Sequence, residues 1–483
     1  MRARSAPSVT SADVTVLKPR GLPFLFVIPE RLEGLVAATA DLADRFAAAG
    51  HNLYLVGGVV RDAITNRLGD HADLDFTTDA LPDETEKLLN GWADAVWTQG
   101  KRFGTIGAKK ADRFYEITTH RAEAYSPDSR KPDVTFSTAV EADLSRRDFT
   151  VNAMALRLPG TEVIDPYEGL VDLAAGRLRT PLSPEESFSD DPLRMLRAAR
   201  FIAGYQLVPD DALVDAVREM APRLSIVSME RVRDELDKLL VVEDPSAGLW
   251  FINQTGLAEH FLPELPGLAV EQDPIHRHKD VLAHTIAVVA NTEPDRILRM
   301  AALLHDVGKP ATRQFGPKGV SFHHHEVVGA RMARKRLTEL RWPTEDLDAV
   351  VTLVELHLRF HTYAMGWTDS AIRRYVRDAG PMLERLNKLT RADCTTRNEA
   401  KAKRLADRMD TLEREIARLR EQEELDSIRP DLDGEQVMKQ LGIAPSREVG
   451  EALSFLLELR LEYGPLGDEE AARRLAEWWK ARG

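Results

Sequence analysis

The hydrophobic and polar positions of this chain change their spacing about a third of the way along it. Between residues 51 and 175, short apolar runs of strand length alternate with short helical stretches, a pattern typical of an α/β unit. Residues 53–56 form an apolar run that ends in two glycines, and residues 103–108 and 114–119 predict a hairpin. We therefore expect a small mixed sheet in this part of the chain.

Helical periodicity surrounds this predicted sheet in sequence. Residues 28–49 place apolar side chains at helical spacing and end before a glycine that suits a C-cap. The periodic stretches after residue 176 are helical. We expect a multidomain fold with an α/β head and an all-α remainder. Its predicted parts are a disordered N-terminus (1–20), the α/β head (21–175), a helical neck (176–270), a further helical domain (271–400) and a helical tail (401–483).

Length and composition fit this division. A chain of 483 residues exceeds the size at which single cores stop growing, and 43% hydrophobic with 30% charged residues is ordinary for a globular protein. One cysteine excludes an intramolecular disulfide framework, and the first 20 residues lack the apolar core of a secretory signal. We predict a cytoplasmic protein without a membrane span. The net charge of −13 excludes a generally basic surface but leaves room for one local groove that binds nucleic acid.

Two glycines follow the first predicted strand, and two aspartates mark the second. Gly57 and Gly58 let the backbone approach a ligand and present free N–H groups where a helix begins, which is a natural phosphate seat. Asp73 and Asp75 lie two positions apart on a predicted strand, so both carboxylates leave the same face. Such a pair beside a phosphate seat suits Mg²⁺ held by protein and substrate together. Each motif alone is more often a turn or a solvated loop.

The order of these motifs resembles a known family. Gly-Gly-x-x-Arg-Asp, followed closely by Asp-x-Asp, is similar to the head of nucleotidyltransferases related to DNA polymerase beta. Within them the chain most resembles the class II tRNA nucleotidyltransferases (CCA-adding enzymes) and the bacterial poly(A) polymerases, over about residues 52–455. The resemblance implies that Asp73 and Asp75 are catalytic and hold Mg²⁺. It also implies nucleotide binding by Gly57, Gly58, Arg61 and Asp62.

Residues 143–155 carry a second candidate motif. We predict a helix here, in which Asp148 and Asn152 share one face beside Arg147. A carboxylate and an amide can both pair with a 2′-hydroxyl, and the resemblance assigns this segment to ribose recognition. A structural cluster of salt bridges is the alternative.

A third motif, Asp-Asp-Pro-Leu-Arg, ends at Arg194. Asp191 and Arg194 are three positions apart at the start of a predicted helix, so an acceptor and a donor project together. Such a pair can read the amine and ring-nitrogen edge that C and A share and that U and G lack. The stretch resembles the Glu-Asp-x-x-Arg protein template of the family, with Asp190 in place of the glutamate. Arg197, one turn further on, is a further candidate nucleotide contact.

Three weaker candidates complete the predicted nucleotide and RNA contacts. Glu116, on the second strand of the predicted hairpin, is either a third carboxylate near the metal or an exposed strand residue. Residues 124–143 resemble the flexible loop that accompanies the switch from C to A addition, with Arg130 as an RNA contact; a plain surface loop is the alternative. Arg231 and Arg233 either contact RNA phosphate or form salt bridges on a helix surface.

Histidines concentrate between residues 274 and 361. Imidazole and carboxylate together suit a divalent transition metal. The pattern resembles the HD phosphohydrolase domain, and its basic ligands match four residues: His284, His305, Asp306 and Asp393. His325 and His357 occupy the positions of the extra ligands in two-metal members. The resemblance leaves open whether the domain is an active phosphohydrolase that repairs 3′ ends.

These motifs together predict template-independent addition of C, C and A to the 3′ end of tRNA from CTP and ATP. One alternative is a bacterial poly(A) polymerase or a partial enzyme that adds only CC or only A. A second makes the HD domain the main activity, acting on cyclic nucleotides or phosphorylated ends. A third is an RNA-binding scaffold on an inactive nucleotidyltransferase fold, against which the two intact aspartates argue.

Overall fold

The structure is a computed structural model. It describes the following residues: 28–69, 73–124, 133–270, 280–316, 319–362, 367–395, 399–423 and 425–482. These form two compact units, the first within Met1–Arg194 and Tyr205–Ala216, and the second within Met195–Gly204 and Val217–Gly483.

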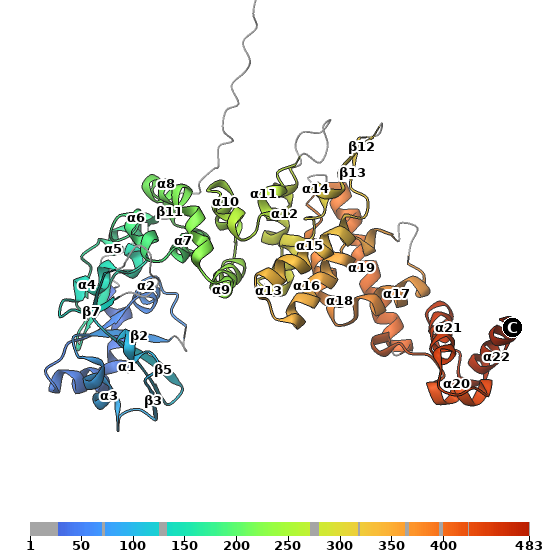
Figure 1. The fold of residues 1–483 in the computed structure, drawn as a ribbon, viewed down its shortest axis with the longest axis horizontal. Coiled ribbons are helices and arrows are strands. Elements are labelled where there is room, and N and C mark those ends of the chain that lie inside the picture. The colour runs from blue at the N-terminus through green and yellow to red at the C-terminus, as the bar shows by residue number, and fades with distance from the viewer. Residues whose placement is uncertain are drawn as a thin grey trace, which may run out of the picture. The chain divides into compact units, whose positions relative to one another are not determined.

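A seven-stranded mixed sheet forms the centre of the first unit, with strand order β3-β4-β5-β2-β1-β8-β9 (Figure 1). All its pairs are antiparallel except β2 with β5. The predicted first strand, the hairpin and the mixed sheet are therefore confirmed. Its strands are β1 (Leu53–Val56), β2 (Leu74–Thr78), β3 (Ala95–Trp97), β4 (Thr105–Lys110), β5 (Arg113–Thr119), β8 (Ala155–Leu158) and β9 (Val163–Ile164).

One face of this sheet carries the main core of the unit. Residues of α1 (Ile28–Ala48), α2 (Gly58–Ile64) and α3 (Pro82–Leu89) pack there against Phe76 and Ile117 of the central strands. Because strand side chains alternate, Asp75 and Glu116 leave the opposite face, where both are exposed. That face is covered beside β1 by α4 (Val140–Ser145), through a smaller apolar cluster.

The remaining elements of the first unit are short. They are β6 (Arg121–Ala124), β7 (Asp133–Phe136), η1 (Lys101–Phe103), η2 (Thr150–Asn152), α5 (Gly169–Ala175), β10 (Arg177–Leu178), α6 (Pro184–Asp190) and β11 (Val208–Pro209). Helices α7 (Leu193–Tyr205) and α8 (Asp211–Met220) contribute residues to both units.

The helix expected over residues 143–155 is wrong. Helix α4 ends at Ser145, Phe149 is extended, and only the single 3₁₀ turn η2 precedes β8. Contacts from distant residues hold the chain in this form. The Thr150 N–H donates to the carbonyl of Arg179, and its hydroxyl donates to the buried carboxylate of Asp172 at 2.7 Å. Local helical spacing could not indicate those partners.

The second unit is helical, apart from the hairpin β12 (Gln314–Gly316) and β13 (Gly319–Ser321), among the residues described. Its central helices are α9 (Met229–Leu240), α10 (Ser246–Gln254), α11 (Glu264–Gly267), α12 (Val281–Asn291), α13 (Arg296–Leu304), α14 (Lys309–Thr312), α15 (His325–Glu339), α16 (Thr344–Leu356), α17 (Asp369–Ala379) and α18 (Leu383–Ala392). Short 3₁₀ turns connect them: η3 (Ala221–Ile226), η4 (Leu257–His260), η5 (Arg359–Thr362) and η6 (Gly380–Met382).

The charged stretch after residue 399 forms the long helix α19 (Glu399–Gln422), which buries one apolar face. After the turn η7 (Leu425–Ser427), three tail helices share a small core of their own. They are α20 (Gly434–Leu441), α21 (Arg447–Tyr463) and α22 (Asp468–Lys480). None of the helices that the structure describes has both the length and the apolar character needed to cross a membrane.

A buried arginine fastens α13 to the end of α9. Arg299 is 1% exposed, and its guanidinium donates to the carbonyls of Leu240, Val242, Glu243 and Thr292. Three of these carbonyls lie at or just past the C-terminus of α9, where no intrahelical donor remains for them. The side chain therefore satisfies backbone acceptors at the end of α9 and the end of α12, of which those of Leu240 and Thr292 are buried.

We predict that Arg299→Leu lowers the free energy of unfolding by about 3 kcal/mol, because it removes the donor from two buried and two partly buried carbonyls. Chemical denaturation followed by helical circular dichroism measures the change. Arg334→Leu is the control, since Arg334 makes an ion pair with Asp348 in which both side chains are about half exposed. That control should change stability by less than about 1 kcal/mol. Equal effects of the two substitutions would contradict the role of Arg299.

Candidate functional site

Three carboxylates gather on the open face of the sheet in the first unit. The parallel register of β2 and β5 pairs Asp75 with Glu116, so their side chains lie side by side. Asp73 stands just before β2. The surrounding protein withdraws Asp75 from water, which disfavours its charged form, and the Glu116 and Asp73 carboxylates repel that charge. These effects outweigh the attraction of Arg147 and raise the pKa of Asp75 to about 6. A divalent cation would relieve this repulsion.

The glycine turn lies at the end of the neighbouring strand. Gly57 has a left-handed φ of 76° and is the N-cap of α2, as the sequence predicted for a turn that opens a helix. A Cβ on Gly57 would lie 3.0 Å from Nη1 of Arg147, so the absent side chain gives room for this guanidinium. The turn therefore combines helix N–H groups with an arginine, and both favour an anion.

Sequence reasoning missed the residue that positions this arginine. Asp143 is fully buried, and its carboxylate accepts a hydrogen bond from Arg147 at 3.1 Å and one from Arg146 at 3.2 Å. Burial opposes its charge, but the two arginines outweigh burial and lower the pKa of Asp143. The only available signal was its spacing of four residues from Arg147, at the end of α4.

Asp148 and Asn152 come together without a regular helix. The Asn152 amide donates to Asp148 at 2.8 Å, and its oxygen accepts from Arg61. Arg61 is 5% exposed, donates to Asp62 and Tyr205, and stacks its guanidinium 4.1 Å from the Tyr205 ring centroid. The predicted phosphate residue Arg61 thus belongs to a buried network that joins the glycine turn to the predicted ribose segment.

The predicted base-reading pair lies at the junction of α6 and α7. Asp191 accepts from the backbone N–H of Leu193 at 3.1 Å. The Arg194 guanidinium donates to the Ser187 hydroxyl at 2.9 Å and to the carbonyl of Arg146. Arg194 is therefore tied to the residue that precedes Arg147.

The other arginine candidates are placed differently. Arg197, in the second unit, lies 3.8 Å from the Glu235 carboxylate. Arg233 pairs with Asp234 at 2.7 Å and donates to a backbone carbonyl, which favours the salt-bridge alternative for this residue. Arg231 is exposed on α9. Arg130 lies outside the described residues.

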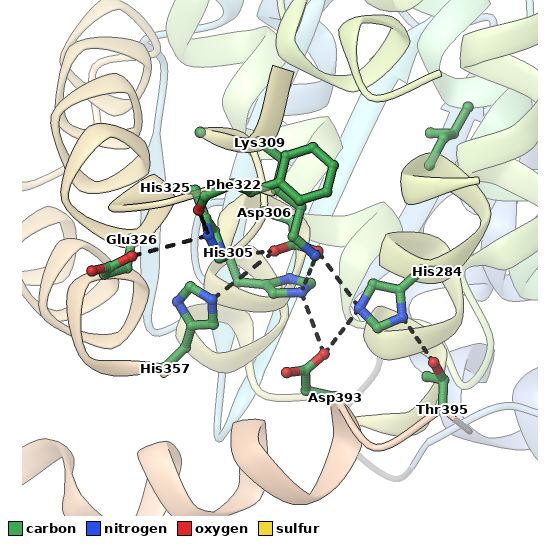
Figure 2. Close-up of polar contacts among 12 residues, drawn as sticks. His284, His305, Asp306, Lys309, Phe322, His325, Glu326, His357, Asp393 and Thr395 are labelled. Carbon is green, nitrogen blue, oxygen red and sulfur yellow. Dashed lines mark hydrogen bonds and ion pairs between the residues drawn. The ribbon is translucent and has the colours of Figure 1, made fainter. Parts of the chain in front are cut away.

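The second unit brings all six predicted HD ligands together (Figure 2). They form two groups of three residues. Within each group the ligand atoms lie within 4.8 Å of one another, and either group could hold a metal ion. Asp306 lies between the groups, 3.2 Å from His305 and 3.3 Å from His325. The first group is His284, His305 and Asp393, and the second is Asp306, His325 and His357.

Each of the four rings is held through its Nδ1 atom. His305, His325 and His357 hydrogen-bond backbone carbonyls of Ala302, Phe322 and Val354 at 2.7–2.8 Å, and His284 bonds the Thr395 hydroxyl at 2.8 Å. This leaves every Nε2 facing the centre, as in metal-ligating histidines. Nε2 of His305, His325 and His357 is buried and makes no hydrogen bond in the structure. Orphaned ring nitrogens beside carboxylates fit a divalent metal.

The charges of this centre are strongly coupled. Burial opposes the charge of His305, but Asp306 and Asp393 overcome it and raise its pKa to about 10. Burial and the neighbouring His305 lower the pKa of His357 to about 3. The two aspartates thus favour positive charge at this centre, which a bound cation would supply.

Three parts of the chain match known family models. Residues 53–179 match the Poly A polymerase head domain, residues 209–268 the probable RNA and SrmB-binding site of polymerase A, and residues 281–416 the HD domain. Nucleotidyltransferase and HD domains generally use divalent metals, in keeping with the carboxylate cluster of the head and the histidine centre.

Curated relatives agree with these matches. The chain is 36% identical over 355 residues to the A-adding tRNA nucleotidyltransferase of Deinococcus radiodurans, covering 70% of this chain and 79% of that protein. It is 38% identical over 240 residues to the CCA-adding enzyme of Limosilactobacillus reuteri and 41% over 222 residues to that of Bacillus subtilis. These two alignments cover 50% and 45% of this chain, and 57% and 53% of the relatives.

Solved structures share the fold. The Bacillus stearothermophilus CCA-adding enzyme in complex with CTP matches with a TM-score of 0.67 at 23% identity, covering 94% of this chain and 98% of that one. The Thermotoga maritima CCA-adding enzyme complexed with tRNA matches with a TM-score of 0.57 at 17% identity, with the same coverage. Together, the matches confirm the resemblance that the motifs indicated.

We predict that the histidine centre binds two divalent ions per chain. His357→Asn should remove one ion, because it deletes a ligand of the second group alone, whereas Asp393→Asn should remove the ion of the first. Elemental analysis after equilibration with Mn²⁺ measures the stoichiometry. His361→Asn is the control, since His361 belongs to neither group. Two bound ions in the His357→Asn protein would contradict the two-site assignment.

Proposed function

Since this chain belongs to the tRNA nucleotidyltransferase family, we propose that it adds C, C and A to the 3′ end of tRNA from CTP and ATP, without a nucleic-acid template. The observation that carries the proposal is the register that sets Asp75 beside Glu116, one strand away from the glycine turn. This arrangement provides carboxylates for a metal and an anion seat in one unit.

The proposed work of the head residues follows from their chemistry. Asp73, Asp75 and Glu116 would hold Mg²⁺, which would supply positive charge to activate the 3′-hydroxyl and to stabilise the leaving pyrophosphate. Gly57, Gly58 and Arg147 seat the triphosphate. No covalent enzyme intermediate is required, because positioning and charge stabilisation carry the rate.

Selection of the nucleotide is proposed for the buried network beside this seat. Asn152, with Asp148 and the Arg61–Asp62 pair, faces the ribose and rejects a sugar that lacks its 2′-hydroxyl. Asp191 accepts from the exocyclic amine of C or A, and Arg194 donates to the ring nitrogen. The bond from Arg194 to the Arg146 carbonyl supports this assignment, because it ties the base reader to the segment that carries Arg147.

The domain layout and location remain proposals of the same kind. The neck (176–270) and tail (401–483) would hold the tRNA, with Arg231 as an exposed contact and Arg130 as a further RNA contact. We place the reaction in the cytoplasm, because the single cysteine suits a reducing compartment.

The decisive assay incubates the protein with Mg²⁺, labelled CTP or ATP, and tRNA transcripts that end before CCA or after CC. We predict growth by C, C and A that then stops. Asp75→Ala should abolish this growth. Because Glu116 is proposed as a third metal ligand, Glu116→Gln should lower kcat by about tenfold or more. Glu33→Gln, on the exposed surface of α1, should leave kcat unchanged.

Other product patterns would change the assignment. Extension of the CC-ending transcript alone would make this an A-adding enzyme, like the Deinococcus radiodurans relative. Growth by CC alone would make it a CC-adding enzyme, and a long A tail on any RNA would make it a poly(A) polymerase. Undiminished growth in the Asp75→Ala protein would remove the catalytic role from the head carboxylates.

A second activity is favoured by the orphaned histidine nitrogens. We propose that the HD centre is a metal-dependent phosphohydrolase acting on phosphorylated or cyclic 3′ ends, with Mn²⁺, Zn²⁺ or another transition metal. Lys309, which contacts Asp306 at 2.6 Å and is partly exposed, would contact the substrate phosphate.

We predict release of phosphate from a 3′-phosphorylated tRNA end by the Mn²⁺-loaded protein. Asp306→Asn should lower this rate at least a hundredfold, because Asp306 faces both ligand groups. Asp75→Ala should retain it, since the head carboxylates belong to the other unit. Equal phosphate release by the Asp306→Asn and unmodified proteins would overturn the proposal.

A further inference from the structure

The row of residues that contains Asp75 and Glu116 continues across two more strands. The register pairs Glu116 with Gly107 of β4, and Gly107 with Trp97 of β3. All four positions therefore leave the same face of the sheet. The row runs from the proposed metal ligands to an aromatic side chain at the edge of the sheet.

Gly107 makes room for that aromatic ring. A Cβ on Gly107 would lie 1.9 Å from Nε1 of Trp97 and 2.2 Å from its Cε2, so the indole lies across β4 where any side chain would block it. The ring thus extends from the edge strand toward Glu116. Its N–H has no hydrogen-bond partner among the described residues.

Two neighbours on the same face complete the surface. Phe114 lies two positions before Glu116, is 47% exposed, and meets the Trp97 ring edge-on with centroids 6.1 Å apart. Lys109 is paired with Phe114 across the strands and holds its ammonium 5.6 Å from that ring. Within the described part of the chain, Lys109 makes no ion pair. We call Trp97, Phe114 and Lys109 the aromatic platform.

The sheet order decides which substrate this platform faces. The glycine turn follows β1 on one side of β2, whereas β5, β4 and β3 extend on the other side. The proposed triphosphate seat and the aromatic platform therefore flank the carboxylates from opposite sides. The acceptor RNA must approach the carboxylates from the side that the incoming nucleotide leaves free.

We infer that the aromatic platform binds the 3′-terminal nucleotides of the acceptor strand, with a base stacked on Trp97 and Phe114 and a backbone phosphate at Lys109. An exposed phenyl ring and a partly exposed indole beside a lysine are the chemistry that recognises single-stranded nucleic acid without a preference for sequence. Binding without a sequence preference suits an enzyme whose RNA substrate has a different 3′-terminal base after each added nucleotide. The inference rests on the proposed tRNA substrate.

Steady-state kinetics separates the two substrates. Trp97→Ala and Phe114→Ala should each raise KM for tRNA about tenfold while KM for CTP and ATP stays unchanged. Trp97→Phe should recover part of the loss, because it retains a ring over Gly107. Lys109→Ala should lower the slope of log affinity for tRNA against log salt by about one, and Lys87→Ala, on the exposed surface of α3, should not change it.

A direct optical test uses tRNA with 2-aminopurine as its 3′-terminal base. Binding to the unmodified protein should quench the fluorescence by stacking, and Trp97→Ala should reduce the quenching even at saturation. A rise in KM for the nucleotide in place of tRNA would overturn the inference, as would unchanged quenching in the variant. If the unmodified protein quenches the probe but adds no nucleotide, the proposed function fails while the platform stands. If it extends tRNA and Trp97→Ala keeps the same KM for tRNA, the platform fails alone.

Discussion

The parallel pairing of β2 with β5 is the constraint on which the head of this protein depends. It is the single parallel contact of the seven-stranded sheet among the described residues, and it places Asp75 next to Glu116. Desolvation by the surrounding protein, together with repulsion from the neighbouring carboxylates, raises the pKa of Asp75. The backbone ladder and the apolar face beneath it supply the free energy that holds them together. A divalent cation converts this unfavourable arrangement into a binding site.

Both sites hold several potential metal ligands close together, but the head does so with strands and the HD centre with helices. In the head, the strands fix the carboxylates from below and leave them open to solvent. In the HD centre, six ligands come from five separate helices or their ends, and each histidine ring is oriented by a hydrogen bond at Nδ1. At the buried centre, Asp306 and Asp393 favour positive charge and raise the pKa of His305. An open site suits an RNA end together with an incoming nucleotide, whereas the more buried centre suits the terminal phosphate group of an RNA end.

Gly57 and Gly107 have similar roles on the two sides of the carboxylates. Each lacks a side chain where another group must lie, the Arg147 guanidinium in the first case and the Trp97 indole in the second. Neither glycine serves merely to end a helix or strand. Their absent side chains create the space for one positive group and one aromatic group, which are suited to a triphosphate and to a nucleobase.

The sequence by itself determined the elements and ligand types that local chemistry specifies. The apolar run before Gly57, the hairpin containing Glu116 and the His-Asp pair at His305 each depend on residues close in the chain, so their patterns were sufficient. Tertiary structure alone decided the rest. The helix predicted through Asp148 does not form, because Thr150 makes hydrogen bonds with Arg179 and Asp172, which are distant in the sequence. Arg61 lies in a buried network because Tyr205, 144 positions away, supplies a ring and a hydroxyl. The link from Glu116 to Trp97 appears only when β3, β4 and β5 pair in register, since strand pairing joins positions that no local pattern connects.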